Sequence, residues 1–222
     1  MIDTHLHILP GVDDGPQRSA AEIRERVNDL QQALDRHFIP LRLFAGHEAL
    51  IQPGLVEDIH AGRLATLNGS RYLLLELWND SWLPETERVI FELRAFGIIP
   101  ILAHPERYRA IQKDPARLAA LMQRGVLAQL TANSLVGSQG NTARRTAETL
   151  LKKRLVHCVA SDAHGMHLRP PYVLSSLLRA EQLVGQTTVS QMTEILPAVI
   201  INNEGYSPGA QSSYQRHKGA GQ

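Results

Sequence analysis

A short apolar stretch near the middle of the chain decides the fold: Ile98-Ile99-Pro100-Ile101-Leu102-Ala103, which runs directly into His104-Pro105-Glu106-Arg107. Six residues, nearly all of them apolar, match the length and character of a strand that is buried on both faces. The preceding segment, residues 84–96, has a helical pattern that stops at Gly97. A helix followed by a buried strand with polar side chains at its end is typical of an α/β protein with a parallel sheet.

The same alternation extends in both directions from this stretch. Ser19 and Glu22 have the spacing of a capping box and begin the first helix-like pattern. Strands are expected at the N-terminus and over residues 41–45, 72–77, 98–103, 126–130 and 156–160. Helices are expected over residues 21–33, 53–59, 84–96, 115–125, 141–153, 174–184 and 189–199. The pattern therefore predicts six short parallel strands, alternating with helices in a barrel or sheet.

The length of the chain suits one domain. We expect residues 1–204 to share a single core, because α/β barrels of about this size fold as one unit. Residues 205–222 are rich in Gly, Ser and Gln and are predicted to be a disordered C-terminal tail.

Composition limits the classes of partner. Lys and Arg total 23 against 22 Asp and Glu, so no net charge favours nucleic acid or a membrane surface as the partner. Cys158 is the only cysteine, which excludes an intramolecular disulfide and suits a buried thiol in a reducing compartment. No apolar run reaches the ~18 residues of a membrane helix, and the first residues lack a signal-peptide pattern. We expect a cytoplasmic protein that is not embedded in a membrane.

The first fifteen residues end in chemically active side chains. His5 and His7 are two apart in an extended segment, so their side chains project to one face and could chelate one metal ion. Asp3 is expected on the same face. Asp13-Asp14-Gly15 follows in a loop where an acidic pair is also compatible with an ordinary turn. A histidine pair can occur by chance, and the acidic loop strengthens the metal interpretation.

Similar side chains follow the other predicted strands. In parallel α/β folds the C-terminal ends of the strands meet at one edge, where the functional site lies. The residues placed there are His5, His7, Glu48, His104, Asp162 and His164. His47 should point away from Glu48 because successive strand residues face opposite sides. Histidine with carboxylate, without cysteine, favours zinc, manganese or iron over a thiolate site.

Two ions at such a site would suit phosphoryl transfer. Glu48 could bridge two cations ~3.5–4 Å apart, which would activate a hydroxide for in-line attack at phosphorus. Arg107 and Arg169 follow metal-ligand motifs, and a guanidinium group matches phosphate oxygens in a bidentate manner. The alternative for each arginine is a surface ion pair.

The ordered motifs D-x-H-x-H, V-D-D-G, G-x-E, A-H-P-E-R-Y and A-S-D-A-H resemble those of the PHP (polymerase and histidinol phosphatase) superfamily. They are most similar to the manganese-dependent tyrosine-protein phosphatases of bacterial capsule and exopolysaccharide operons. The resemblance implies a distorted (βα) barrel of seven strands with up to three metal ions. By position, it assigns His5, His7, Glu48 and Asp162 to the first metal, Glu48 and His104 to the second, and Asp14 and His164 to the third.

The chain departs from that family pattern after the D-D-G loop. A helix, a strand and a T-P-H-type motif are missing between this loop and the helix expected over residues 21–33. The barrel is therefore expected to have six strands instead of seven. The third metal would keep only Asp14 and His164.

The resemblance implies a metal-dependent protein-tyrosine phosphatase that acts on a tyrosine autokinase of polysaccharide synthesis. Mn²⁺ is the expected ion, with Zn²⁺ or iron as alternatives, at two or three ions per chain, and the chain could form a homo-oligomer. His164 could protonate the leaving phenolate. One alternative is an amidohydrolase-like metal hydrolase, although no lysine stands at a strand end to bridge two metals. Another is a degenerate member that binds metal or phosphoprotein without turnover.

Overall fold

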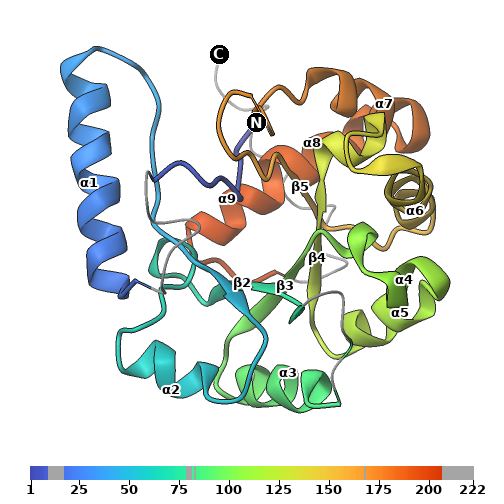
Figure 1. The fold of residues 1–222 in the computed structure, drawn as a ribbon, viewed down its shortest axis with the longest axis horizontal. Coiled ribbons are helices and arrows are strands. Elements are labelled where there is room, and N and C mark those ends of the chain that lie inside the picture. Colours follow the sequence, from blue (N-terminus) through green and yellow to red (C-terminus); the bar gives the residue numbers. More distant parts are fainter. Residues whose placement is uncertain (10–17, 79–81, 83, 168, 207–222) are drawn as a thin grey trace, which may run out of the picture.

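A parallel sheet of five strands lies at the centre of the molecule (Figure 1). The computed structural model describes residues 1–9, 18–78, 82, 84–167 and 169–206. The sheet order is β1-β2-β3-β4-β5, and each strand pairs in parallel with the next along the chain. The strands are β1 (Glu48–Leu50), β2 (Tyr72–Glu76), β3 (Ile99–Ala103), β4 (Leu127–Thr131) and β5 (Cys158–Ala160). The predicted α/β class is confirmed.

The predicted number of six strands is wrong. Residues 41–45 are not a strand, and β1 begins only at Glu48. The Gln31 side chain takes backbone groups of this segment, since it accepts from Leu43 N at 2.8 Å and donates to Leu41 O at 3.0 Å. A side-chain amide thus occupies the place where a neighbouring strand would bond.

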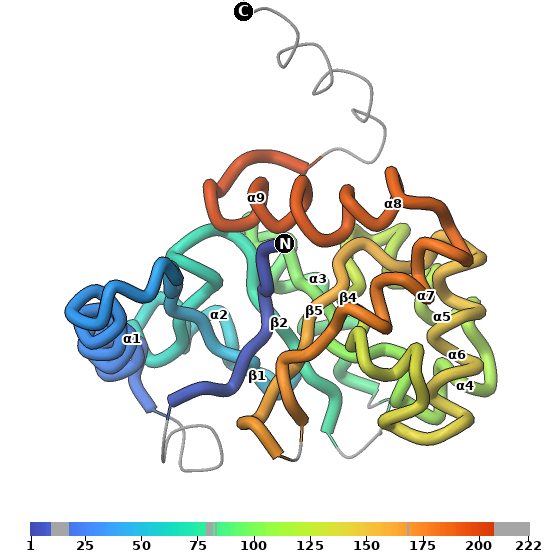
Figure 2. The backbone as a smooth tube through the Cα atoms, turned by 90° about the horizontal axis from the view of Figure 1, so that it is seen from above, coloured from blue at the N-terminus to red at the C-terminus, as the bar shows by residue number. Residues whose placement is uncertain are grey.

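The N-terminal segment, residues 1–9, is also not a full strand. It runs beside β5 (Figure 2) but forms a single parallel bridge, between Leu6 and Ala163. His7 N donates to Ala163 O at 2.9 Å, and Asp162 N donates to His5 O at 3.0 Å. Among the described residues no strand joins this segment to β1, which is therefore an end strand of the sheet.

Helices follow the strands as the sequence pattern predicts, with one short helix, α4, that was not expected. They are α1 (Ala20–Arg36), α2 (Leu55–His60), α3 (Thr86–Ala95), α4 (Arg109–Lys113), α5 (Ala116–Gln123), α6 (Gly140–Lys152), α7 (Leu174–Val184), α8 (Gln186–Ser190) and α9 (Leu196–Ile201). The 3₁₀ helices are η1 (Leu67–Gly69), η3 (Pro105–Arg107) and η4 (Ala132–Val136), and a π-helical turn, η5 (Gln191–Ile195), joins α8 to α9. The predicted capping box of α1 is present, with Ser19 Oγ and the Glu22 carboxylate each accepting from the other residue's backbone N–H.

The sheet is buried on both faces because its side chains alternate between two clusters. Leu73 and Leu75 of β2 belong to a large cluster shared with α2, α3, α5 and α6. Tyr72 and Leu74 belong to a smaller cluster with Leu196 and other residues of α9. This double burial explains why the strands are continuous apolar runs in the sequence. Cys158 is a free thiol in the smaller cluster, as predicted.

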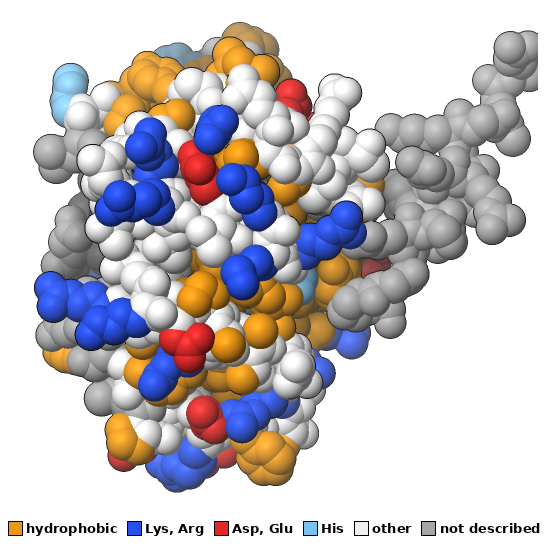
Figure 3. All heavy atoms as spheres, turned by 90° about the vertical axis from the view of Figure 1, so that its right-hand side faces the viewer, with side chains coloured by type: hydrophobic (Ala, Val, Ile, Leu, Met, Phe, Trp, Pro, Cys, Tyr) orange, Lys and Arg blue, Asp and Glu red, His pale blue; other side chains and the backbone are white. Residues whose placement is uncertain are grey.

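α1 stands apart from the sheet (Figure 1), and in it only Ala20 and Ile23 are fully buried. Lys and Arg side chains gather over the opposite side of the molecule, formed by α4 to α7 (Figure 3). Although basic and acidic residues are nearly equal in number over the whole chain, they are not evenly distributed over its surface. None of the described helices is long and apolar enough to cross a membrane. The predicted tail lies, from residue 207 onward, outside the described residues.

Candidate metal centre

Six predicted side chains meet at one edge of the sheet. They come from the N-terminal segment, from β1, and from the turns after β3 and β5: His5, His7, Glu48, His104, Asp162 and His164. Together with Glu76 at the end of β2, they form three groups whose ligand atoms lie within 4.8 Å of one another: His5, His7 and Glu48; His7, Asp162 and His164; Glu48, Glu76 and His104. Asp14, the remaining predicted ligand, lies outside the described residues.

Glu48 connects the first group to the third. One carboxylate oxygen, Oε2, lies 3.2 Å from His5 Nε2 and 3.3 Å from His7 Nε2. The other, Oε1, lies 3.0 Å from His104 Nε2. A carboxylate whose two oxygens face separate sets of imidazole nitrogens has the arrangement of a ligand that bridges two cations.

Asp162 belongs to the second group, with His7 and His164. Its Oδ1 lies 3.5 Å from both His5 Nε2 and His164 Nδ1, and 3.7 Å from His7 Nε2. The rings of His7 and His164 are stacked, with centroids 3.8 Å apart. The Nε2 atoms of His5 and His7 are only 2.9 Å apart. Imidazole nitrogens that converge on carboxylate oxygens are a donor set that fits a transition-metal cation.

Two of the candidate ligands have a left-handed backbone conformation. His104 follows β3 with φ 35°, and Asp162 follows β5 with φ 51°. Non-glycine residues in this region cost ~1–3 kcal/mol each, and such strain concentrates at functional sites. These turns come directly after β3 and β5. They direct the side chains of His104 and Asp162 toward the edge of the sheet, where Glu48 lies.

The electrostatics of the site also favour a cation. Burial raises the pKa of Glu76, and the neighbouring Glu48 carboxylate raises it further. For Glu48 itself burial acts in the same direction, but hydrogen bonds from His104, His5 and His7 outweigh it and hold its pKa well below the ordinary range. Burial, and then the charge of His7, lower the pKa of His164, which favours the neutral imidazole that binds metals.

Both predicted arginines reach the centre through Asp162. Arg107 Nη2 donates to Asp162 Oδ2 and to Thr131 Oγ1, the latter at 2.9 Å. Arg169 Nη1 donates to the same Asp162 oxygen at 2.9 Å. Burial raises the pKa of Asp162, but the charges of His5, Arg107 and Arg169 outweigh burial and lower it. The arginines therefore border the ligand cluster and hold its aspartate in place.

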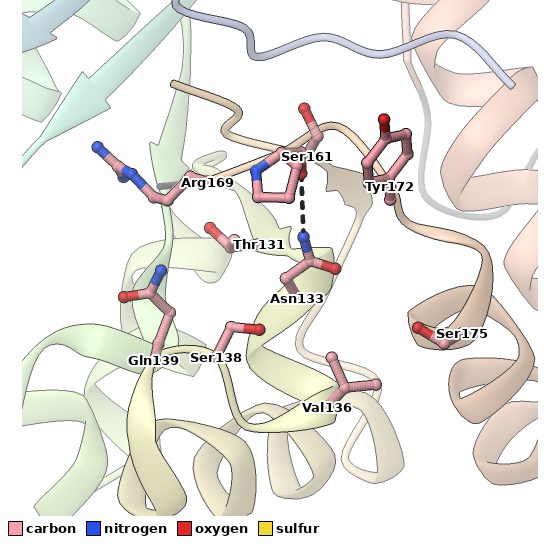
Figure 4. Close-up of a pocket in the computed structure, with 10 residues that line it drawn as sticks. Thr131, Asn133, Val136, Ser138, Gln139, Ser161, Arg169, Tyr172 and Ser175 are labelled. Atoms are coloured by element: carbon pink, nitrogen blue, oxygen red, sulfur yellow. Dashed lines mark hydrogen bonds between the residues drawn. The ribbon is translucent and has the colours of Figure 1, made fainter. Parts of the chain in front are cut away.

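A pocket lies beyond Arg169, between η4 and the start of α7 (Figure 4). It has a volume of about 240 Å³, and its lining includes Thr131, Asn133, Ser138 and Tyr172. Asn133 Nδ2 donates to Pro170 O at 3.3 Å. None of the described residues that line it is a histidine or carries a carboxylate, so it is separate from the ligand cluster.

Two members of the site were not predicted. Glu76 ends β2, so the strand-end rule applies to it, but the apolar run around it hides that position in the sequence. Gln129 lies in the middle of β4, and its Oε1 is 2.9 Å from His5 Nδ1. It also donates to Thr4 Oγ1 at 2.8 Å. A glutamine within an otherwise apolar strand was the feature of the sequence that could have indicated this role.

Gln129 can hold His5 in the tautomer that binds metals. When Nδ1 of His5 carries the proton, it donates to the amide oxygen 2.9 Å away and leaves the lone pair on Nε2, toward Glu48 and Asp162. We expect Gln129→Met to weaken metal binding by roughly 10- to 100-fold, the usual effect of losing a partner behind a ligand. Metal titration followed by calorimetry measures this. Gln123→Met, on the exposed end of α5, is the matched control. Equal affinities in both variants would contradict the role of Gln129.

Two neighbours of the ligands face elsewhere. Asp3 was expected beside His5 and His7, but its Oδ1 accepts from Ser161 N at 3.1 Å and from His5 N at 3.3 Å. Its short side chain ties the N-terminal segment to the end of β5. The ring nitrogens of His47 contact Arg18 O at 3.1 Å and Ala65 N at 2.9 Å. His47 is therefore turned away from Glu48, as predicted.

Comparison with known proteins identifies the family. Residues 16–202 match the family described as capsular polysaccharide synthesis, CpsB/CapC. The chain belongs to the CpsB/CapC family. The resemblance to the tyrosine phosphatases of capsule operons is thereby confirmed.

Members of the CpsB/CapC family with known names are similar over most of their length. The tyrosine-protein phosphatase YwqE of Bacillus subtilis is 30% identical, across 87% of this chain and 89% of its own. CapC of Staphylococcus aureus is 31% identical, across 82% of this chain and 84% of its own. A chain from the crystal structures of YwqE and of CpsB from Streptococcus pneumoniae, described as unique metal-dependent tyrosine phosphatases, superposes with a TM-score of 0.88. It is 28% identical, and the match covers 93% of this chain and 96% of that chain.

This chain is internally shorter than its CpsB/CapC relative YwqE. The alignment runs over 226 positions but uses only 87% of the 222 residues present here. Some tens of positions in YwqE therefore have no counterpart, in agreement with the expected missing segment. Its place after Asp14 stays a prediction, because residues 10–17 lie outside the described part.

Proposed function

We propose that this chain is a metal-dependent protein-tyrosine phosphatase. The observation that carries the proposal is Glu48, whose two carboxylate oxygens face His5 and His7 on one side and His104 on the other. Family membership supports the same conclusion, since the relatives YwqE and CpsB bear the name tyrosine-protein phosphatase. The proposed substrate is a tyrosine-phosphorylated protein of polysaccharide synthesis.

The ligand set fits divalent cations, and we propose Mn²⁺, with Zn²⁺ or iron as alternatives. His5, His7, Glu48 and Asp162 would hold one ion, and Glu48, His104 and Glu76 a second. His164, together with Asp14, would contribute to a third. When bound, such ions act as Lewis acids that activate water and neutralise phosphoryl oxygens.

The arginines provide the remaining positive charge. Arg107 and Arg169 contact one oxygen of Asp162 from the side opposite the histidines, so their other N–H groups can bind phosphoryl oxygens. Thr131 holds Arg107 in this orientation through its hydroxyl oxygen. Fixed guanidinium groups stabilise the charge of an in-line displacement without reorganising.

We assign His164 to metal binding in preference to proton donation. Its lowered pKa favours the neutral imidazole, and a neutral imidazole is a poor proton donor to a leaving group. Tyrosine makes a small demand in this respect, because the conjugate acid of its phenolate has a pKa of ~10. A barrel of the PHP type, made from the sheet and the N-terminal segment, is part of this proposal. The cytoplasmic location and the oligomeric state stay predictions.

Metal removal and return tests the function. We expect protein from which a chelator has removed the metal to hydrolyse neither p-nitrophenyl phosphate nor a phosphotyrosyl peptide. Added Mn²⁺ should restore both activities. A His7→Ala variant should fail to recover. Elemental analysis should give at least two ions per chain in the recovered protein and fewer in the variant.

Two outcomes would contradict the proposal. Hydrolysis of an amide or dihydropyrimidine substrate without phosphatase activity would favour the amidohydrolase alternative. Binding of metal and phosphopeptide without turnover would identify a degenerate member of the family.

A further inference from the structure

A long groove opens from the metal centre between the N-terminal segment and β1. Its volume is about 920 Å³, at the upper end of the ~300–1,000 Å³ usual for small-ligand pockets. Residues 1–9 line one side and residues 41–48 the other. The ligands His5, His7, Glu48, His104 and Asp162 and both arginines line the same space. The groove is therefore continuous with the proposed catalytic site and much larger than one phosphotyrosyl side chain requires.

The wall away from the ligands is apolar and exposed. Leu41 is 53% exposed, Phe44 42% and Ile8 36%. Val27 and the buried Ile23 of α1 also line the groove. Large apolar side chains left in contact with water beside a functional centre mark a binding surface.

The edges of the groove suit an extended chain. β1 is an end strand of the sheet that the described residues form, and its Glu48 and Leu50 line the groove. The facing N-terminal segment is itself extended and joins β5 through the Leu6–Ala163 bridge. Edge strands bind peptides as an added strand, with alternate side chains held in pockets. An extended peptide between these two edges would run toward Glu48 and the arginines.

We propose that this groove binds the residues next to the phosphotyrosine of the substrate, as an extended segment with large apolar side chains against Leu41 and Phe44. The inference rests on the proposed phosphatase function and adds the substrate class. A second copy of the chain is the competing occupant. The substrate is favoured because the proposed metal ligands and the two arginines line the same groove and would bind the phosphate of the same peptide.

A peptide series on the unchanged protein is the first test. Two phosphotyrosyl peptides of equal length and charge are compared, one with leucine and phenylalanine beside the phosphotyrosine, one with serine and glycine. We expect kcat/KM for the apolar peptide to exceed that for the polar one by about tenfold or more, which corresponds to ~1.4 kcal/mol, within reach of burying one large apolar side chain. Equal values would overturn the proposal.

Paired variants locate the effect. Leu41→Ser with Phe44→Ser should abolish the preference for the apolar peptide, while p-nitrophenyl phosphate, which does not reach the groove wall, is hydrolysed as before. The matched control is Phe91→Ser with Leu178→Ser, two exposed apolar side chains that do not line the groove. Loss of the preference in the control, or its persistence in the groove variant, would overturn the proposal. Phe44→Ser alone provides a milder change if the double variant melts early.

Binding separates this inference from the phosphatase function. A phosphonate analogue of each peptide, which cannot be hydrolysed, is titrated by fluorescence anisotropy. Tighter binding of the apolar analogue with no turnover of any phosphate ester would contradict the function and leave the groove assignment standing. Turnover of phosphate esters with equal binding of both analogues would support the phosphatase function and contradict the groove assignment. If the groove variant instead converts a dimer into a monomer in sedimentation, the occupant is a second copy and the proposal fails.

Discussion

Replacing Glu48 by glutamine is expected to remove bound metal from two of the three ligand groups at once. Glutamine has nearly the same shape, but its amide nitrogen cannot accept and would oppose His5, His7 or His104 across 3.0 to 3.3 Å. Loss of a carboxylate that serves two ions should exceed the ~10- to 100-fold typical of a residue behind the ligands. We expect kcat/KM to fall on the order of 1000-fold.

Metal content and turnover of the same preparation measure this effect. Glu57→Gln, on the exposed side of α2, is the matched control and should keep both its ions and its activity. Excess Mn²⁺ should rescue Glu48→Gln only in part, because the missing ligand lowers the affinity of both sites. If the variant holds two ions as tightly as the original protein, Glu48 is not a bridging ligand.

The ligand cluster could be predicted because strand ends are readable in the sequence. Apolar runs ending at His104 and Asp162 mark where parallel strands stop, and the stopping points of parallel strands meet at one edge. Glu48 was found for a partly wrong reason, since it begins β1 instead of following a strand at 41–45. Its long side chain reaches the histidines from the first residue of β1.

The strand count and the supporting residues depend on contacts that span the chain. Residues 41–45 have strand-forming side chains, but Gln31 bonds two of their backbone groups, and among the described residues no strand pairs with them. Gln129 matters because the N-terminal segment brings His5 beside it, 124 residues away in sequence. Composition and periodicity describe local preference, and neither specifies which distant group arrives as the partner.

The two arginines provide the most discriminating test of phosphate binding. Removing either Arg107 or Arg169 should lower kcat/KM by roughly 100-fold or more, as for other preorganised donors to a developing charge. Melting temperatures should barely move, because the side chains are partly exposed, at 20% and 33%, and Asp162 keeps the other arginine in each single variant. Arg124→Ala is the matched control, since this arginine forms a surface ion pair with Glu87.

The same variants must be read together with their metal content, because both arginines touch Asp162. If they bind phosphate, Arg107→Ala and Arg169→Ala keep their ions, while inhibition by inorganic phosphate weakens in step with kcat/KM. Arg107→Lys should recover little, because an ammonium group is a point charge that cannot hold Asp162, Thr131 and a phosphoryl oxygen in one fork. If ions are lost along with activity, the arginines act only by holding Asp162. If activity stays intact, they are structural ion pairs.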